Sequence, residues 1–265
     1  MINNERSYTT YVYDGSFNGL ITCIYNAYYD KVSTEEIYIV SETEDYSQSA
    51  LFDREVAVET SEEKAKRVMS ALIKKVSYDV YYNIYMVYLS YYPQKGELIY
   101  RYVKMCFSMG KKVLSHISHP VVAEINRISR RVSGEKHKYL GFIRFAQIES
   151  GAYFSKINPE NNQLELIAPH FLERMPNENW IIYDERRGLA CVHKRNEGFM
   201  ITDDIPLDIF NNIDKLSTKE ELTYNELWKA FFNTIGIKER YNPRCQRNLM
   251  PKRYWENMLE VKDKL

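Results

Sequence analysis

The spacing of apolar residues changes near residue 140 of this 265-residue chain. Before that point apolar side chains recur every three or four residues, a period typical of amphipathic helices. After it, short runs rich in aliphatic and aromatic residues lie between turn signals such as Asn158-Pro159 and Arg187-Gly188, and they predict strands at 141–149, 152–157, 180–184, 188–193 and 199–202. The sequence therefore predicts an α+β fold, with a helical N-terminal lobe and an antiparallel sheet flanked by helices in the C-terminal half.

Two lobes follow from this change of pattern. Residues 1–116 are predicted to form a mainly helical lobe with a short strand or strands, at 7–13 and 36–40. Residues 117–265 are predicted to form an α+β lobe that contains the sheet and ends in a basic tail. A chain of this length can also fold as one compact unit, so both arrangements remain open.

Local signals place the helices. Residue 14 is expected to cap a helix that runs to about residue 29, and the capping box Thr60-x-x-Glu63 begins another. Further helices are predicted at 79–91, at 97–113 and after Pro120, and Ser217-x-x-Glu220 begins a last one. The apolar residues of that last helix are expected to point inward: Tyr224, Leu227, Trp228, Phe231 and Ile235.

The sequence contains no membrane span, secretion signal or cofactor motif. Its longest uncharged stretches, residues 15–29 and 80–94, are short of the roughly 20 apolar residues that span a bilayer. The four cysteines lack the short-range pairing of a disulfide framework or a metal site, and no Gly-rich phosphate loop occurs. We therefore expect a cytoplasmic protein without membrane contact, metal or cofactor.

Charge is segregated along the chain although the net charge is zero. Residues 30–63 contain 11 acidic and 2 basic residues, whereas residues 101–147 contain 10 basic and 2 acidic ones. The tail from 238 to 255 adds 6 basic residues against 1 acidic. Such segregation favours binding of a polyanion to one face of the molecule.

Basic and aromatic residues alternate in the tail, a combination that neutralises phosphates and offers rings to bases. The alternatives are a solvated tail in which Tyr254 and Trp255 anchor the terminus, or a basic patch for an acidic protein or for lipids. With the basic stripe predicted after Pro120, the candidate nucleic-acid-binding residues are Arg127, Arg130, Arg131, Lys138, Arg144, Arg244, Arg247, Lys252, Arg253 and Trp255.

Polar residues are densest at the predicted helix–strand junction. A carboxylate beside an imidazole can act as a general base, and a strand arginine can bind a phosphate. The alternative is structural, with Glu135 and Arg144 paired and His137 capping a helix. The residues available for acid–base chemistry are His137, His170, Asp14, Glu135 and Asp184.

Tyrosines recur at helical intervals between residues 78 and 92. Their rings form either a stacking surface for unpaired bases or an amphipathic core face, and the second is the commoner role of such a stripe. The residues are Tyr78, Tyr81, Tyr82, Tyr85, Tyr88 and Tyr92.

Several segments in a fixed order resemble one family. The sequence letters are YVYDGSF at 11–17 with GL at 19–20, HKYLGFIRF at 137–145, APHF at 168–171, WIIYD at 180–184, LW at 227–228 with FF at 231–232, NPRCQR at 242–247 and MPKRYW at 250–255. They are similar to a bacterial DNA-metabolism or DNA-repair protein family that accompanies a DNA-repair radical-SAM protein. A related domain of unknown function is fused behind an unusual uracil-DNA glycosylase.

The resemblance covers most of the chain and implies a role without implying a reaction. The matched polar or aromatic positions are His137, Arg144, His170, Asp184, Arg247, Arg253 and Trp255. We expect an accessory protein of DNA metabolism that binds nucleic acid, and the expected partners are DNA and the radical-SAM protein. The alternatives are an enzyme that acts on a modified base or on the nucleic-acid backbone, and a module that docks the radical-SAM protein alone.

Overall fold

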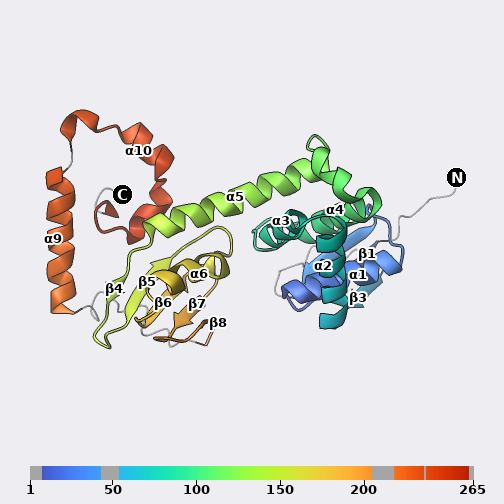
Figure 1. Ribbon diagram of the computed structural model, residues 1–265, viewed down its shortest axis with the longest axis horizontal. Helices are drawn as coiled ribbons and strands as arrows, with labels where there is room; N and C mark the ends of the chain where they lie inside the picture. Colours follow the sequence, from blue (N-terminus) through green and yellow to red (C-terminus); the bar gives the residue numbers. More distant parts are fainter. Residues whose placement is uncertain (1–7, 43–53, 205–217, 236, 263–265) are drawn as a thin grey trace. The chain divides into compact units, whose positions relative to one another are not determined.

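A computed structural model describes residues 8–42, 54–204, 218–235 and 237–262. The chain forms two compact units, unit 1 (Met1–Ser133) and unit 2 (Gly134–Leu265). Helix α5 (Pro120–Phe142) begins at the proline as the sequence predicts (Figure 1). The sequence places the boundary between lobes at 116/117, before this helix, whereas the compact units divide at 133/134, inside it.

Unit 1 contains a three-stranded parallel sheet in the order β2-β1-β3. The strands are β1 (Thr9–Tyr13), β2 (Ile37–Ser41) and β3 (Arg54–Ala57). The first two match the predicted strands, but β3 was not predicted. Its residues are mostly exposed, so the segment lacks the alternation of apolar residues that identifies a strand.

Before α5, the described residues of this unit form four α-helices: α1 (Phe17–Tyr29), α2 (Glu62–Lys75), α3 (Tyr78–Tyr88) and α4 (Lys95–Met109). A 3-10 helix, η2 (Gly110–Ser115), follows α4. The predicted caps of the first two helices were wrong by one or two residues, because Ser16 caps α1 and Ser61 caps α2. The hydroxyl of Thr60 instead donates to Asp14 Oδ2 at 2.8 Å.

The core of unit 1 includes tyrosines whose hydroxyls find acceptors. Tyr100 is fully buried and donates to the carbonyls of Ala27 and Val32, and burial raises its pKa to about 12. Helix α4 approaches strand β2 closely at Gly96. A Cβ at that position would lie 2.4 Å from the carbonyl oxygen of Ile39, so only glycine fits there.

Unit 2 contains a five-stranded sheet in the order β4-β5-β6-β7-β8. Its strands are β4 (Ala146–Gln147), β5 (Tyr153–Ile157), β6 (Trp180–Asp184), β7 (Leu189–His193) and β8 (Phe199–Thr202). All neighbours are antiparallel except β5 and β6, which are parallel. The α+β class with a mainly antiparallel C-terminal sheet is confirmed.

Two local predictions in this unit need correction. The strand predicted at 141–149 is wrong over most of its length, because α5 continues to Phe142 and only two residues join the sheet. Helix α6 (Leu164–Arg174), which connects the parallel strands, was not predicted. Its internal Pro169 is a residue that normally argues against a helix, yet Leu164, Ile167 and Phe171 bury one face of it.

The C-terminal segment comprises α9 (Lys219–Ile235), η3 (Lys238–Arg240), α10 (Pro243–Leu249) and η4 (Lys252–Asn257). The predicted cap Ser217 lies outside the described residues, and Thr218 Oγ1 accepts from Glu221 N at 3.0 Å. The expected inward apolar face of α9 was wrong. Phe232 packs against the core of unit 2, whereas the predicted residues are exposed: Tyr224, Leu227, Trp228, Phe231 and Ile235.

The core of unit 2 is built around Trp180, which is fully buried. The tail contributes Tyr254, Trp255, Met258 and Val261 to the same cluster. Of the helices in the described part of the chain, none is both long enough and apolar enough to cross a bilayer.

Candidate functional site

Buried polar residues gather in unit 2 where the parallel strands β5 and β6 end. Ile157 and Asp184, the last residues of these strands, are paired in register. The segments that follow them therefore leave the sheet at the same edge. In sheets with parallel strands, this carboxyl edge is where ligands commonly bind.

Glu135 reaches this edge from α5 and is 3% exposed. Its carboxylate accepts hydrogen bonds from the backbone N–H groups of Glu160 and Asn161, at 2.9 and 3.0 Å. The side-chain amides of Asn161 and Gln163 also donate to it, at 2.6 and 3.1 Å. Four donors thus hold this carboxylate and fix segment 158–163 against α5.

Arg253 reaches the same place from η4. Its guanidinium forms an ion pair with Glu160, and one nitrogen lies 3.9 Å from Glu135 Oε1. The same guanidinium lies over the ring of Tyr254, 5.0 Å from its centroid, and donates to the Tyr254 hydroxyl at 3.0 Å. These contacts hold η4 to the loop that follows β5.

Asp184 and Arg187 form a second ion pair at this edge, with 2.8 Å between Arg187 Nη1 and Asp184 Oδ2. Arg187 also donates to the carbonyl of Glu160 at 2.6 Å. Burial raises the pKa of Asp184, although the pairing with Arg187 works in the opposite direction. We call Glu135, Glu160, Asp184, Arg187 and Arg253 the carboxylate centre.

The histidines predicted as acid–base residues lie away from the carboxylate centre. His137 is exposed on α5, and the half-buried His170 on α6 contacts the ring of Phe171. Neither histidine hydrogen-bonds to Glu135 or Asp184, and Asp14 belongs to unit 1, where Ser16 and Thr60 donate to it. The described ranges contain no group of three or more residues able to hold a metal ion.

Several predicted nucleic-acid-binding residues are held by contacts inside the protein. Arg144 donates to Glu260 at 2.8 Å and to two backbone carbonyls. Arg127 forms two hydrogen bonds with Glu124, and Lys138 lies over the ring of Tyr254. Trp255 is buried, and its indole N–H donates to the carbonyl of Met250 at 2.8 Å.

Other predicted cations are open to solvent. In unit 1, Arg130 is exposed and Arg131 lies over the ring of Tyr91. In unit 2, exposed cations follow one another along α10 and its flanking turns. We call them the α10 cations: Arg240, Arg244, Arg247 and Lys252. Within the described part of the chain, their side chains make no hydrogen bond or ion pair, although Lys252 lies 5.6 Å from the centroid of the Trp255 ring.

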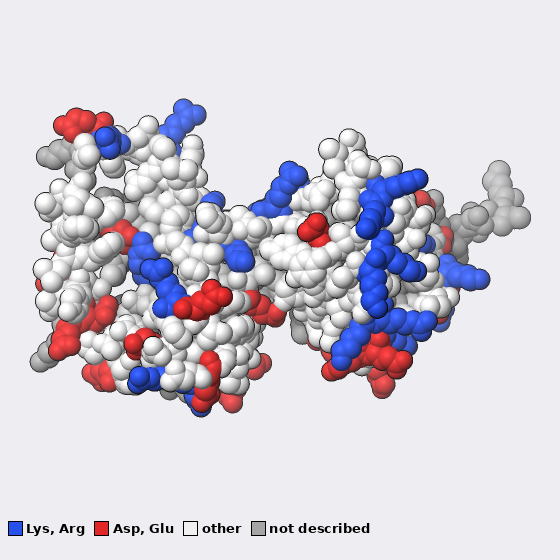
Figure 2. All heavy atoms as spheres, viewed as in Figure 1, with Lys and Arg blue, Asp and Glu red and all other residues white. Residues whose placement is uncertain are grey.

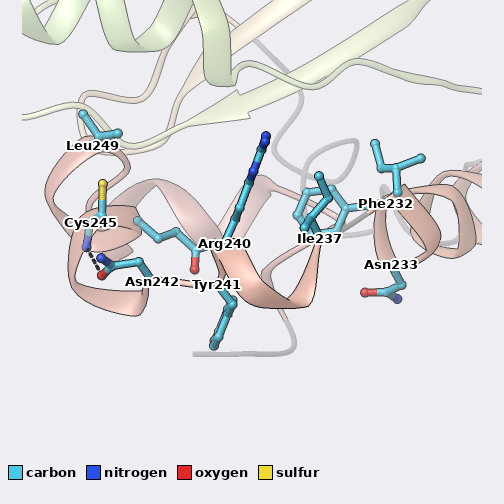
Figure 3. Close-up of a pocket in the computed structure, with 10 residues that line it drawn as sticks. Phe232, Asn233, Ile237, Arg240, Tyr241, Asn242, Cys245 and Leu249 are labelled. Carbon is cyan, nitrogen blue, oxygen red and sulfur yellow. Dashed lines mark hydrogen bonds between the residues drawn. The ribbon is translucent and has the colours of Figure 1, made fainter.

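A cavity of about 650 Å³ lies between α9 and α10. Figure 3 shows Ile237 and Arg240 between Phe232 of α9 on one side and Cys245 and Leu249 of α10 on the other. Its lining is mainly apolar, with the guanidinium of Arg240 as the charged group. Volumes of this size are typical of small-ligand or peptide-anchor sites.

Unit 1 contains an aromatic groove that the sequence analysis did not find. We call it the α1–α2 groove; its volume is about 320 Å³. It is lined by Ile24, Tyr25, Tyr28, Tyr29, Arg67, Val68, Ala71, Lys75, Val103 and Phe107. Figure 2 shows Lys and Arg side chains gathered in a band over α2, which forms one wall of this groove.

The tyrosine stripe of α3 is mainly a packing surface. Tyr81, Tyr85 and Tyr88 surround Phe17, with centroid distances of 6.2, 5.1 and 5.1 Å. Tyr88 also donates from its hydroxyl to the carbonyl of Gly15 at 2.9 Å. Of the stripe, Tyr78 is exposed.

One comparison with known proteins gives a match. A family described as a domain of unknown function, DUF4130, matches residues 93–260, which is more than half of the chain. The matched region includes the carboxylate centre and the α10 cations, but little of the α1–α2 groove. No curated protein and no solved structure matches the chain. The chain belongs to the family of this domain of unknown function.

Proposed function

We propose that this protein is an accessory protein of DNA metabolism that binds nucleic acid through the α10 cations. The observation that carries the proposal is the exposure of Arg244, Arg247 and Lys252 without a carboxylate partner among the residues that the structure describes. Cations already paired with carboxylates must give up those contacts before they bind phosphate. The α10 cations have no such contacts to lose.

The resemblance to a bacterial DNA-repair family that accompanies a radical-SAM protein supports this role. The segments around Arg247 and Arg253 are among those that carry the resemblance. In unit 1, exposed Arg130 and the adjacent Arg131 supply further positive charge. Because charge is segregated along the chain, the basic segments attract a polyanion and the acidic segments repel it.

The carboxylate centre has a positioning role in this proposal. Arg253 is fixed by Glu160 and Glu135, and buried Tyr254 and Trp255 follow it. Lys252 precedes these anchored residues, so its backbone is held in place although its side chain is exposed. A rigid support lowers the conformational entropy that is lost when a phosphate binds.

Contacts of this kind hold the phosphate backbone without reading the base sequence. Each phosphate contact on double-stranded DNA changes the slope of log affinity against log salt by about 0.9. The binding is therefore expected to weaken steeply as salt rises. It is also expected to differ little between duplexes of different sequence.

The test compares two double variants by fluorescence anisotropy with labelled DNA over a range of salt. Arg244→Ala/Arg247→Ala should lower the slope by about 1.8 on duplex DNA. Lys194→Ala/Arg195→Ala, which removes two exposed cations elsewhere in unit 2, should leave the slope unchanged. Absence of binding by the unmodified protein at low salt, or equal slopes for the two variants, would refute the proposal.

A second candidate function rests on the exposed apolar face of α9. Leu227 and Phe231 are 59% and 53% exposed, and isolated globular units rarely leave such a face uncovered. The neighbouring cavity adds Arg240, so charge complementarity favours an apolar partner segment with acidic residues. We propose the radical-SAM protein indicated by the resemblance as that partner.

This second candidate is tested with the purified radical-SAM protein in the presence of nuclease. Leu227→Glu/Phe231→Glu should abolish a complex measured by analytical ultracentrifugation, because two carboxylates would be buried in the interface. Lys194→Glu/Arg195→Glu should leave the complex intact. If the unmodified protein self-associates and Leu227→Glu/Phe231→Glu abolishes that self-association, the partner on this face is instead a second copy of the chain. If the unmodified protein forms no complex at all, docking is refuted.

A further inference from the structure

The α1–α2 groove is built from matching faces of three helices. Helix α1 contributes residues 24, 25, 28 and 29, and α4 contributes Val103 and Phe107, which are one turn apart. From α2 come Arg67, Ala71 and Lys75, spaced four residues apart on one face. Buried Ile24, Val68 and Val103 form an apolar floor.

The aromatic rings of this groove are clustered, and two of them are exposed to solvent. Tyr28 is 44% exposed and Tyr29 is 57% exposed. The ring of Tyr29 lies 4.5 Å from that of Tyr25 and 5.9 Å from that of Tyr28, and Tyr28 lies 5.8 Å from Phe107. Neighbouring rings fix one another in place, so the faces that remain exposed are preorganised for stacking.

Two cations border these rings. Arg67 is exposed, and its side chain makes no hydrogen bond or ion pair within the described ranges. Lys75 lies 6.0 Å from the centroid of the Phe107 ring. Their eight-residue separation on α2 corresponds to about 12 Å along the helix. Exposed rings beside separated cations are the combination that binds unpaired bases together with their phosphates.

We propose that the α1–α2 groove binds single-stranded nucleic acid, with one base stacked on Tyr28, a neighbouring base stacked on Tyr29, and the flanking phosphates bound by Arg67 and Lys75. The inference rests on the proposed nucleic-acid binding and specifies its substrate class. A duplex presents no open base face, so the groove selects single strands. The α10 cations bind the backbone of either form.

The experiment measures anisotropy of a labelled oligothymidylate and of a labelled duplex with the full chain. Tyr28→Ala/Tyr29→Ala should weaken binding of the single strand by about tenfold or more, without changing its salt slope. Arg67→Ala/Lys75→Ala should lower the single-strand slope by about 1.4, or 0.7 for each phosphate contact. Neither variant should alter duplex binding.

Matched controls lie on the same helices or beside them. Lys74→Ala removes an exposed cation next to Lys75 that does not line the groove, and Tyr78→Ala removes an exposed tyrosine of α3. Both should leave single-strand affinity unchanged. Circular dichroism and thermal melting establish that each variant is folded.

The outcomes separate this inference from the proposed function. Single-strand binding that is lost in Arg244→Ala/Arg247→Ala but unchanged in both groove variants would overturn the groove and leave the α10 cations supported. Equal losses on single strand and duplex in the groove variants would also overturn it. Binding of free thymidine monophosphate with an affinity equal to that of the oligomer would show a mononucleotide site and overturn the single-strand assignment.

Discussion

The guanidinium of Arg253 lies 3.9 Å from the carboxylate of Glu135. This contact joins the C-terminal segment to helix α5, which begins at Pro120. The sequence analysis predicts that Arg253 contacts a phosphate and that Glu135 is available for acid–base chemistry. In the structure they serve together with Glu160 to hold the loop after β5. Their contacts make the carboxylate centre a source of stability.

Replacement of Glu135 by alanine is expected to lower the free energy of unfolding by about 3–5 kcal/mol, because it leaves the buried amide donors of Asn161 and Gln163 without their acceptor. Urea denaturation followed by circular dichroism measures the change. Glu173→Ala, at an exposed position of α6, should change it by less than about 0.5 kcal/mol. Similar values for the two variants would contradict the assigned role of the centre.

Trp255→Ala is expected to destabilise the protein by about 3–5 kcal/mol, since the ring is buried in the core of unit 2. At a temperature where the variant is still folded, DNA affinity per folded molecule should be unchanged. Anisotropy corrected for the folded fraction measures this. Loss of affinity without loss of stability would show that Trp255 stacks on a base.

The ion pair of Arg144 with Glu260 predicts a pH dependence of stability. Burial, the largest single influence, tends to raise the pKa of Glu260. The hydrogen bond and charge of Arg144, together with hydrogen bonds from the Glu260 backbone and the Trp228 side chain, outweigh it, and the pKa falls below its ordinary value of 4.5. Below pH 4.5 the unfolded chain therefore binds more protons at this site than the folded one, and stability is lost as pH falls.

The corresponding variant is Glu260→Gln, which should show a shallower loss of stability below pH 4.5 than the unmodified protein. Glu173→Gln, at its exposed position, should retain the original slope. Urea denaturation at a series of pH values gives both slopes. A steeper loss in Glu260→Gln would contradict the assignment.

Two glycines offer a paired test of packing. Gly96→Ala should destabilise the protein, because its new Cβ would lie 2.4 Å from the Ile39 carbonyl oxygen and 2.7 Å from the Ile39 Cβ. Gly134→Ala, in α5 with no neighbouring atom within 4 Å, should stabilise it by about 1 kcal/mol through helix propensity. Thermal melting gives the sign of each change. A stabilised Gly96→Ala would contradict the close approach of α4 to β2.

Periodic segments were predictable from the sequence, because their signal is local. The helix beginning at Pro120 and the strands of residues 180–184 and 199–202 follow from apolar spacing and turn residues. Helix α6 was missed because Pro169 argues against a helix, whereas burial of Leu164 and Phe171 outweighs that local preference. The direction of the β5–β6 pairing was missed because it depends on that helix as the connection.

The candidate sites could not be fully predicted from the sequence, because they are formed by contacts between distant segments. The charge pattern of the sequence indicated Arg244 and Arg253 alike. Only the fold shows that Arg253 is paired with Glu160, whereas Arg244 has no carboxylate partner among the described residues. The α1–α2 groove combines residues from three helices, none of which carries a distinctive motif. Tyr28 and Arg67 are 39 positions apart, so no periodicity links them.

Strand β1 occupies the centre of the parallel sheet of unit 1, and Thr9 pairs with both Ile37 and Arg54. Neither neighbour can form by a simple hairpin, since parallel strands require a crossover connection. During translation this buried strand emerges before either of its partners, and its second hydrogen-bonding edge stays open until the third strand has been made. Nascent chains are therefore expected to be vulnerable to aggregation at this strand.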